Sequence, residues 1–339
     1  MEYSIDDDKK KNYSGLSVNE LRQICIDSNI NINNKPITLK GAYIRKKDLI
    51  ELLISEKDNV KNGKIPLKQK KTAHLKEINT ENCYSLAVKG ERDYMEDTFT
   101  INTFEDIRIY AVFDGHGGDE ISTKLVKVFP KALFQNLTKE IRYDIKKVKN
   151  IITKLYSKID ELLKKEYGES GSTAIVCITI ANTIYMINLG DSRGILYYYK
   201  NNEPVILHAT SDHKPNNIIE KLWINKCNGT VEEEDDDDPR VDGILALSRA
   251  FGDYGLKYSN IDNKVGPVSN IPDIKCYPND FSKKLHIILA SDGLWDVMTN
   301  EQALQYIDRE NIKNSCKLIV QDALKTSTDN ITVLIASLN

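Results

Sequence analysis

Short apolar runs separated by turns dominate the chain from Cys83 onward. Each run has the length of a strand and is bounded by turn-forming or charged residues, which is the pattern of a buried β-strand. The strands predicted in this way are Cys83–Val88, Thr98–Ile101, Ile107–Phe113, Ala174–Ile180, Thr183–Leu189, Ile195–Lys200, His286–Ala290 and Ile331–Ala336. Because several of them follow one another through short connections, we expect an antiparallel sheet.

Apolar residues spaced by three and four predict helices among these strands. The longest such pattern runs from Ile141 to Glu166, and one apolar face at this spacing is typical of an amphipathic helix. Further helices are predicted over Asp119–Gln135, Asn216–Asn225, Glu301–Tyr306 and Ser315–Lys325. Strands and helices are clustered rather than strictly alternating, so the predicted fold class is α+β.

The first part of the chain has a different texture, and we predict three segments: residues 1–57, 58–77 and 78–339. The first is a polar tail followed by a small helical module, with helices over Leu16–Ile30, where Ser17 and Glu20 form a capping-box pattern, and Lys47–Ile54. The second is a lysine-rich linker. Its run Lys68–Lys71 fits a nuclear address or a nucleic-acid patch as well as a solvated linker. The third is the main domain.

Composition narrows the class of protein. The chain has 339 residues, 40% hydrophobic and 29% charged, with a net charge of −3, which describes an ordinary soluble protein and argues against a strongly basic nucleic-acid binder. No apolar run is long enough for a transmembrane helix, and no signal peptide is evident. The six cysteines are scattered, which suggests reduced thiols in a cytoplasmic or nuclear protein rather than disulfides or a zinc site.

Candidate chemistry lies at strand ends. The predicted strand Ile107–Phe113 ends at Asp114, which is followed by Gly-His-Gly-Gly. Three further aspartates, Asp191, Asp292 and Asp329, also sit beside predicted strands, and Glu96 and Asp97 form a fifth acidic position. A single carboxylate in such a place is usually a turn residue. Five acidic positions together would repel one another unless a cation lay among them.

All-oxygen ligands without cysteine or histidine spacing indicate Mg²⁺ or Mn²⁺. Two such ions sharing one carboxylate can activate a water for attack on phosphorus. None of the cysteines lies in a loop that would suit cysteine-based phosphatase chemistry.

Eight motifs occur in the order found in the metal-dependent protein phosphatase 2C family, and the chain resembles that family over Cys83–Ser337. The motifs are RDYMED, VFDGHGG, ESGSTA, NLGDSR, DHKP, LALSRAFGD, SDGLWDVM and TDNITVLI. The resemblance implies a central β-sandwich of two antiparallel sheets flanked by antiparallel helices, a four-layer αββα arrangement. It also implies hydrolysis of phosphoserine and phosphothreonine on proteins without a phosphoenzyme intermediate.

The resemblance also implies roles for the acidic residues. Asp114 would bridge two metal ions, with Asp292 and Asp329 completing the first site. Glu96 and the carbonyl of Gly115 would hold the second site, and Asp97 would support it or orient a bound water. Asp191, with Asp292, would hold a weaker third ion.

Two residues outside that carboxylate set carry the remaining roles. By the same resemblance, Arg92 would bind the substrate phosphate, a task that suits the guanidinium fork. His116 would be the general acid that protonates the leaving oxygen.

Several alternatives remain open. The N-terminal segment resembles SAP-like modules, so its partner is either DNA or a protein, and a third interpretation is a local docking or stabilising element. The acidic stretch Glu232–Asp238 either selects basic phosphopeptides, gathers metal ions or is a solvated loop. The whole chain could also be a phosphoprotein-binding scaffold, although no core ligand is missing. A monomer is expected, as is usual for phosphatases of this fold.

Overall fold

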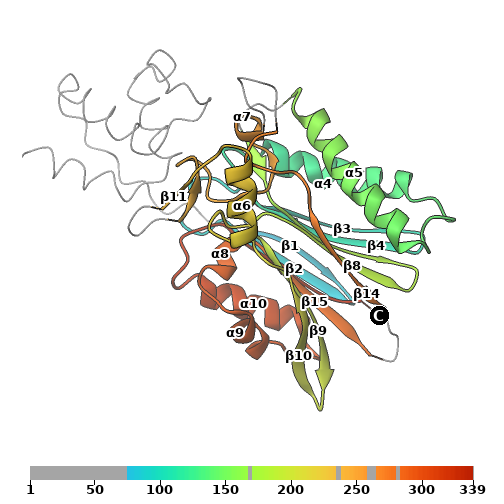
Figure 1. Cartoon of the computed structure of the whole chain (residues 1–339). Coiled ribbons are helices and arrows are strands. Elements are labelled where there is room, and N and C mark those ends of the chain that lie inside the picture. The colour runs from blue at the N-terminus through green and yellow to red at the C-terminus, as the bar shows by residue number, and fades with distance from the viewer. Residues whose placement is uncertain (1–74, 167–169, 234–237, 258–264, 280–282, 339) are drawn as a thin grey trace, which may run out of the picture.

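The computed structural model describes residues 75–166, 170–233, 238–257, 265–279 and 283–338 (Figure 1). The predicted helical module at residues 1–57 and most of the predicted linker lie outside these ranges. The first strand, β1 (Leu75–Thr80), begins inside the range assigned to the linker, before the predicted domain start at residue 78. Within the described ranges, no helix is both long and apolar enough to cross a membrane.

Two antiparallel sheets form the body of the domain. One has six strands in the order β1-β2-β16-β15-β9-β10, and the other has five in the order β14-β8-β7-β4-β3. Their remaining bounds are β2 (Cys83–Val88), β3 (Thr98–Phe104), β4 (Ile107–Phe113), β7 (Ala174–Ile180), β8 (Thr183–Leu189), β9 (Arg193–Lys200), β10 (Glu203–Ala209), β14 (Asp273–Pro278), β15 (Leu285–Ala290) and β16 (Ile331–Ser337).

The central strands of the two sheets are buried on both faces, which explains why the sequence shows continuous apolar runs there rather than alternation. On β4, Tyr110 and Val112 belong to the apolar cluster shared by both sheets, together with residues of β15 and β16. Ile109 and Phe113, on the opposite face of the same strand, pack against helices. Successive side chains of a strand point to opposite faces, so one strand contributes to two cores.

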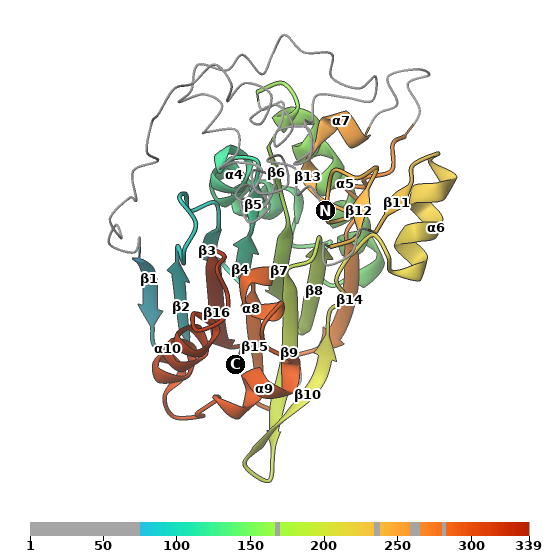
Figure 2. The same ribbon diagram turned by 90° about the vertical axis from the view of Figure 1, so that its left-hand side faces the viewer.

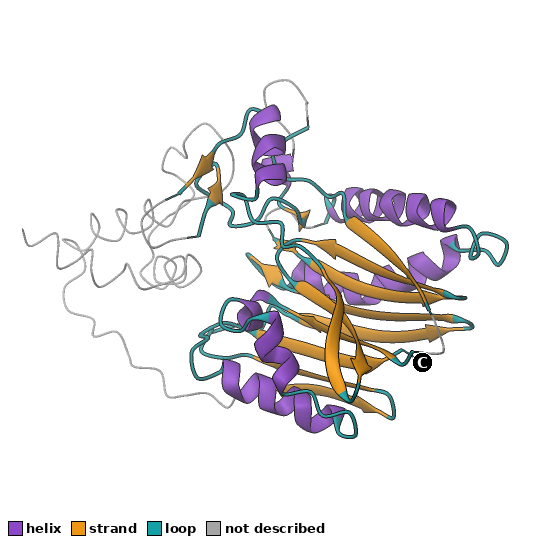
Figure 3. Cartoon of the chain, turned by 60° about the horizontal axis from the view of Figure 1, so that its bottom comes forward, coloured by secondary structure: helices purple, strands orange, loops and turns teal. Residues whose placement is uncertain are grey.

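Helices cover the outer faces of the sheets (Figure 3). Helices α4 (Glu120–Asn136) and α5 (Ile145–Leu163) pack on the five-stranded sheet, with Phe129 and Tyr156 in edge-to-face contact at 5.4 Å. Helices α9 (Asn300–Gln305) and α10 (Ile312–Ala323) pack on the six-stranded sheet. These antiparallel sheets with separate helices confirm the α+β class.

Capping residues account for the differences between predicted and observed helix ends. The helix predicted to begin at Ile141 begins at Ile145, because the Asp144 side chain accepts a hydrogen bond from the Lys147 N–H at 3.1 Å. Asn311 caps α10 through the Asn314 N–H at 3.0 Å, so that helix begins before the predicted Ser315. An N-cap side chain satisfies a backbone donor that the helix itself leaves unpaired.

Small elements gather at one end of the sheets (Figure 2). Two-residue strands β5 (Gly115–His116), β6 (Gly171–Ser172) and β13 (Phe251–Gly252) form a three-stranded sheet in the order β13-β6-β5. The pair β11 (Val231–Glu232) and β12 (Arg240–Val241) forms another sheet. The remaining described helices are α6 (Ile218–Lys226), α7 (Tyr254–Lys257) and α8 (Asp292–Trp295).

A buried histidine in the six-stranded sheet makes the fold sensitive to acid. His286 on β15 is 3% exposed, stacks on Tyr197 at 5.2 Å and meets Tyr199 edge-to-face, and neither ring nitrogen has a hydrogen-bond partner. Burial, together with the charges of Lys284 and Arg309, lowers its pKa to about 4. The unfolded chain, with a pKa near 6.5, binds this proton more readily, so stability falls as pH drops.

We therefore expect His286→Phe to retain the ring stacking and to lessen this loss of stability. Between about pH 7 and about pH 4.5, the free energy of unfolding of the variant should fall by roughly 2 kcal/mol less than that of the unsubstituted protein. Urea unfolding at a series of pH values measures it. The exposed Lys158→Gln on α5 is the control and should follow the unsubstituted protein. Parallel curves for His286→Phe would contradict the prediction.

Candidate metal centre and active site

Strand directions bring four aspartates to the same end of the two sheets. Asp114 directly follows β4, and Asp191 follows β8 after one glycine; both strands are antiparallel to β7, so they end at the same edge. Asp292 begins α8 just after β15, and Asp329 lies just before β16, the antiparallel partner of β15. The end of one strand and the start of its antiparallel neighbour share an edge.

The electrostatics show that these carboxylates influence one another across the two sheets. Loss of hydration raises the pKa of Asp114 well above its ordinary value, and the charges of Asp292, Asp97, Asp191 and Asp329 raise it further. Loss of hydration also raises the pKa of Asp292, as do Asp191 and Asp329. Like charges held together in this way favour a proton or a cation.

Side-chain cations of the protein meet two of these carboxylates. Arg92 Nη2 lies 2.5 Å from Asp329 Oδ2, and Lys214 Nζ lies 2.9 Å from Asp191 Oδ2. The other oxygen of Asp191 is buried without a hydrogen-bond partner, and so is Oδ1 of Asp97. Across the described part of the chain, no three acidic, histidine or cysteine side chains are grouped as a ready metal site.

The donors nevertheless fit a hard divalent cation. They are carboxylate oxygens, two of which lack a partner in a buried setting, and such oxygens are the ligands that Mg²⁺ and Mn²⁺ prefer. The raised pKa values report unbalanced negative charge, which a cation would neutralise.

The predicted second site is held in place by backbone contacts. Glu96 Oε1 accepts a hydrogen bond from the Gly118 N–H at 2.7 Å, and the Glu96 N–H donates to Asn330 Oδ1 at 2.7 Å. Gly115 lies so close to this segment that a Cβ atom would come within 2.6 Å of the Glu96 carbonyl oxygen. Only glycine fits there, so the backbone of Gly115 approaches the Glu96 segment closely.

Asp97 is buried behind the cluster. Its Oδ2 accepts a hydrogen bond from Ser291 Oγ at 2.7 Å. Burial raises its pKa to about 6, and the hydrogen bond from Ser291 opposes this change. Asp97 therefore links the RDYMED segment to the residue just before Asp292.

His116 contacts a residue that the sequence reasoning missed. Its Nε2 lies 2.8 Å and 3.0 Å from the two carboxylate oxygens of Asp253, which is fully buried. Burial alone would lower the pKa of His116, but Asp253, followed by Asp191 and Glu96, raises it above its ordinary value.

Two further residues were missed although their motifs were noted. Lys214 belongs to DHKP and contacts Asp191, and it also lies 3.9 Å from Asp238 of the acidic stretch. Asp296 belongs to SDGLWD, and loss of hydration raises its pKa to about 6, with Lys214 opposing this change and Asp191 adding to it. The signal was present, because each motif contained a second charged residue to which no role was given.

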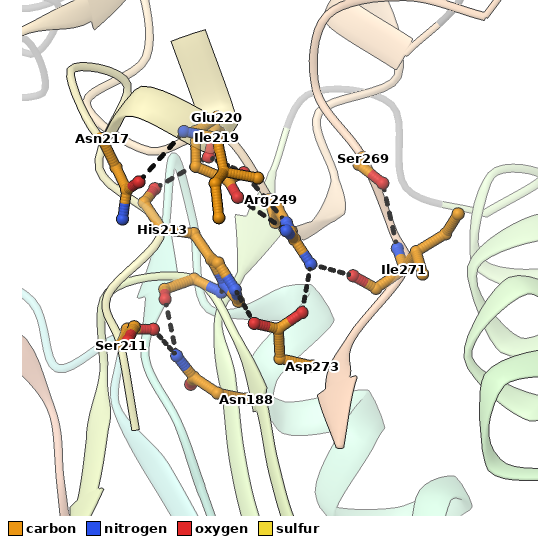
Figure 4. A network of polar contacts seen from close by, with 12 residues as sticks. Asn188, Ser211, His213, Asn217, Ile219, Glu220, Arg249, Ser269, Ile271 and Asp273 are labelled. Carbon is orange, nitrogen blue, oxygen red and sulfur yellow. Dashed lines mark hydrogen bonds and ion pairs between the residues drawn. The ribbon is translucent and has the colours of Figure 1, made fainter. Parts of the chain in front are cut away.

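Figure 4 shows a polar network that includes His213, Arg249 and Glu220. Through His213, this network supports the turn that carries Asp191. The Gly190 N–H donates to His213 Nδ1 at 3.0 Å. Because Nδ1 is the acceptor, the ring proton is on Nε2, which lies 3.5 Å from Asp273 Oδ2. Arg249 joins Asp273 at 2.9 Å to Glu220 on α6, with which it makes two hydrogen bonds of 2.6 Å and 2.9 Å. The network therefore connects α6, the DHKP segment and β14.

We expect Glu220→Gln to destabilise the protein, because it leaves the largely buried Arg249 with one charged partner instead of two. Arg249 is 15% exposed and Glu220 is 4% exposed. The loss should be roughly 2 kcal/mol, or about 5 °C in the melting temperature. Thermal unfolding measures it. Glu161→Gln on α5, which is exposed, should melt with the unsubstituted protein; equal melting of both variants would contradict the prediction.

Comparison with known proteins agrees with the motif order. A model of the family described as protein phosphatase 2C matches residues 83–332. Protein phosphatase 1L of Bos taurus is 33% identical over 275 residues, which are 76% of this chain and 73% of that protein. Protein phosphatase 1B of Homo sapiens is 34% identical over 277 residues, which are 74% of this chain and 55% of that protein.

Solved structures share the fold. A phosphatase from a pathogenic strain of Toxoplasma gondii is 25% identical, with a TM-score of 0.63 over 77% of this chain and 94% of that chain. A serine-threonine phosphatase 2C from Toxoplasma gondii has a TM-score of 0.61 at 24% identity, over 78% of this chain and 99% of that chain. At that identity, the second likeness shows the fold alone.

Proposed function

Because the chain belongs to the protein phosphatase 2C family and is a serine/threonine protein phosphatase, we propose that it hydrolyses phosphoserine and phosphothreonine directly. In this proposal, a water activated between two divalent ions is the nucleophile, and no phosphoenzyme forms. The observation that carries it is the placement of Asp114, Asp191, Asp292 and Asp329 at the same end of the two sheets.

In this proposal, Asp114 would bridge two Mg²⁺ or Mn²⁺ ions. Asp292 and Asp329 would complete the first site, Glu96 and the Gly115 carbonyl would hold the second, and Asp97 would support it. Asp191 and Asp292 would hold a weaker third ion. When bound, the ions polarise the phosphoryl oxygens and make a water acidic enough to attack phosphorus.

The remaining roles are phosphate binding and proton donation. Arg92 is 41% exposed and pairs with Asp329, so its guanidinium group is accessible to a phosphate from solvent. Its planar fork matches two phosphoryl oxygens. His116 protonates the leaving oxygen, and the partial exposure of its side chain, 26%, leaves a path for substrate.

The wider arrangement is also part of the proposal. Three apolar clusters lie one after another through the domain: one between helices and a sheet, one between the two sheets, and one between the other sheet and its helices. This order supports the four-layer αββα fold of the family. Substrates are phosphoproteins. We propose a monomer in the cytoplasm or nucleus, where the free thiols of the five described cysteines are stable. A DNA or protein partner for residues 1–57 stays a prediction.

The acidic stretch Glu232–Asp238 remains a candidate for substrate selection. Its described residues include Glu233, which lies 3.6 Å from Lys221, and Asp238, which lies near Lys214. Paired acidic residues beside the carboxylate cluster would favour basic phosphopeptides over acidic ones; residues 234–237 lie outside the described residues.

We expect the purified chain to hydrolyse p-nitrophenyl phosphate and a phosphothreonine peptide with Mn²⁺ or Mg²⁺, and to stop when EDTA is added. Asp292→Asn should lower turnover by roughly 100-fold or more, because it removes one charge from the set that holds the ions. Calorimetric titration should show weaker Mn²⁺ binding by the same variant.

Asp322→Asn on α10 is the matched control and should keep both Mn²⁺ binding and turnover. Folded protein that binds a phosphopeptide without turning it over in either metal would instead favour the phosphoprotein-binding scaffold.

Arg92→Lys keeps the charge and removes the planar fork. We expect the kcat/KM for the phosphothreonine peptide to fall about tenfold, because the ammonium group replaces two directed hydrogen bonds with a point charge. Steady-state kinetics measure it, and Mn²⁺ affinity should change less than kcat/KM. An unchanged kcat/KM would remove Arg92 from the phosphate site.

A further inference from the structure

The small three-stranded sheet places His116 opposite a buried carboxylate. In its register, His116 of β5 pairs with Gly171 of β6, and Gly171 pairs in turn with Gly252 of β13. Asp253 follows Gly252 directly and lies within 2.8 Å of His116 Nε2. A Cβ atom on Gly171 would collide with both His116 Nε2 and the Asp253 carboxylate. Glycine at this position is therefore what allows the two side chains to meet.

Asp253 has a backbone conformation that is uncommon for a residue other than glycine. Its φ angle is 52°, in the left-handed region, where Asp is found only occasionally. Its carboxylate is fully buried. A buried carboxylate with an uncommon backbone conformation therefore contacts the imidazole of His116.

A second buried carboxylate anchors the segment on either side of Asp253. Asp160 on α5 is 1% exposed, and its Oδ1 accepts a hydrogen bond from the Gly252 N–H at 2.8 Å. Its Oδ2 accepts from Lys257 Nζ at 2.7 Å and from Asn270 Nδ2 at 2.8 Å.

The backbone of Asp160 also contacts this segment. The carbonyl oxygen of Asp160 accepts from the Tyr254 hydroxyl at 2.8 Å. Thus α5 holds the residue before Asp253, the residue after it and the end of α7. Both carboxylate oxygens of Asp160 and its carbonyl oxygen therefore accept hydrogen bonds from residues 252–257.

We infer that Asp253 is the positioning residue of His116, that Asp160 is its buried anchor, and that the proton given to the leaving oxygen comes from Nδ1. This rests on the proposed function. The Asp253 carboxylate accepts a hydrogen bond from the Nε2–H of His116, which fixes the ring orientation and stabilises the imidazolium, as a buried carboxylate does for a catalytic histidine elsewhere. Nδ1 has no recorded partner among the described residues, so it is the nitrogen left for substrate.

The step balances with water as the only other reactant. The water oxygen forms the new bond to phosphorus while the bond to the leaving oxygen breaks, and its electron pair stays on that oxygen. The leaving oxygen takes the Nδ1 proton. His116 is then neutral, and its Nε2–H still donates to Asp253. The two protons of the attacking water stay with the inorganic phosphate, which releases one to solvent, and solvent returns a proton to Nδ1 before the next turnover.

The test compares two leaving groups with the metal-loaded full chain. A threonine alkoxide needs a proton in order to leave, whereas p-nitrophenolate departs readily as the anion. We expect Asp253→Asn to lower phosphothreonine turnover roughly 100-fold, and to lower it at least about tenfold more than p-nitrophenyl phosphate turnover. Asp322→Asn should leave the ratio of the two rates unchanged.

A double-mutant cycle adds a readout that a merely structural role would not produce. If Asp253 acts through His116, the double variant His116→Gln with Asp253→Asn should be no slower on the phosphopeptide than His116→Gln alone, within about threefold. If the rate loss of the double variant equals the product of the two single losses, Asp253 acts independently of His116, and the inference is overturned.

Other outcomes are equally decisive. Equal loss on both substrates by folded Asp253→Asn overturns the inference and leaves the proposed function standing, whereas absence of turnover by the unsubstituted chain overturns both. Circular dichroism monitors folding. If Asp253→Asn does not fold, Asn270→Ala, which removes one of three hydrogen bonds to the Asp160 carboxylate, should shift the same ratio a few-fold in the same direction. An unchanged ratio in that variant would overturn the role of the anchor.

Discussion

The repulsion among carboxylates at one end of the two sheets is the constraint on which the rest of the site depends. Loss of hydration disfavours each charge, and the neighbouring charges disfavour it again, so the pKa values of Asp114 and Asp292 are both raised well above ordinary values. The protein partly offsets this with Arg92 and Lys214. The remaining imbalance makes the site receptive to cations.

A rigid frame is needed to keep like charges together. Asp114 and Asp191 extend from strands that are buried on both faces, and Asp292 and Asp329 flank a neighbouring antiparallel pair. Because each strand contributes to two apolar cores, the carboxylates are unable to separate without disrupting packing. The polar network around His213, Arg249 and Glu220 holds the Gly190–Asp191 turn in the same manner, with charge pairs instead of apolar contacts.

Apolar runs and motif spacing predicted most of this frame. The strands from Cys83 to Ile331 were located because burial on both faces leaves a continuous apolar run. Strands β10 and β14 were missed, because they are less buried and mix polar with apolar residues. The observed helix starts differ from the predicted ones where Asp144 and Asn311 act as N-caps. Both are common polar residues, and the sequence alone does not show which of them cap a helix.

Some residues of the site could be predicted from the sequence and others could not. Residues beside a strand end could be found in the sequence, because an apolar run points to them: Asp114, Asp191, Asp292 and Asp329 all follow this rule. Asp253 and Lys214 could not be assigned a role in this way, since their contacts depend on two-residue strands and on a loop after β10, whose geometry no periodicity encodes.

The Asp160–Lys257 pair shows why such contacts persist despite their cost. Both side chains are almost completely buried, at 1% and 4% exposed, and a buried ion pair often stabilises a fold less than apolar residues of the same size would. Burial lowers the pKa of Lys257, while Asp160 opposes that change. What the pair provides is direction: Asp160 accepts hydrogen bonds from Gly252, Tyr254 and Lys257, which hold these residues at fixed positions around Asp253. An apolar core would fill the same space without fixing the orientation of the carboxylate that faces His116.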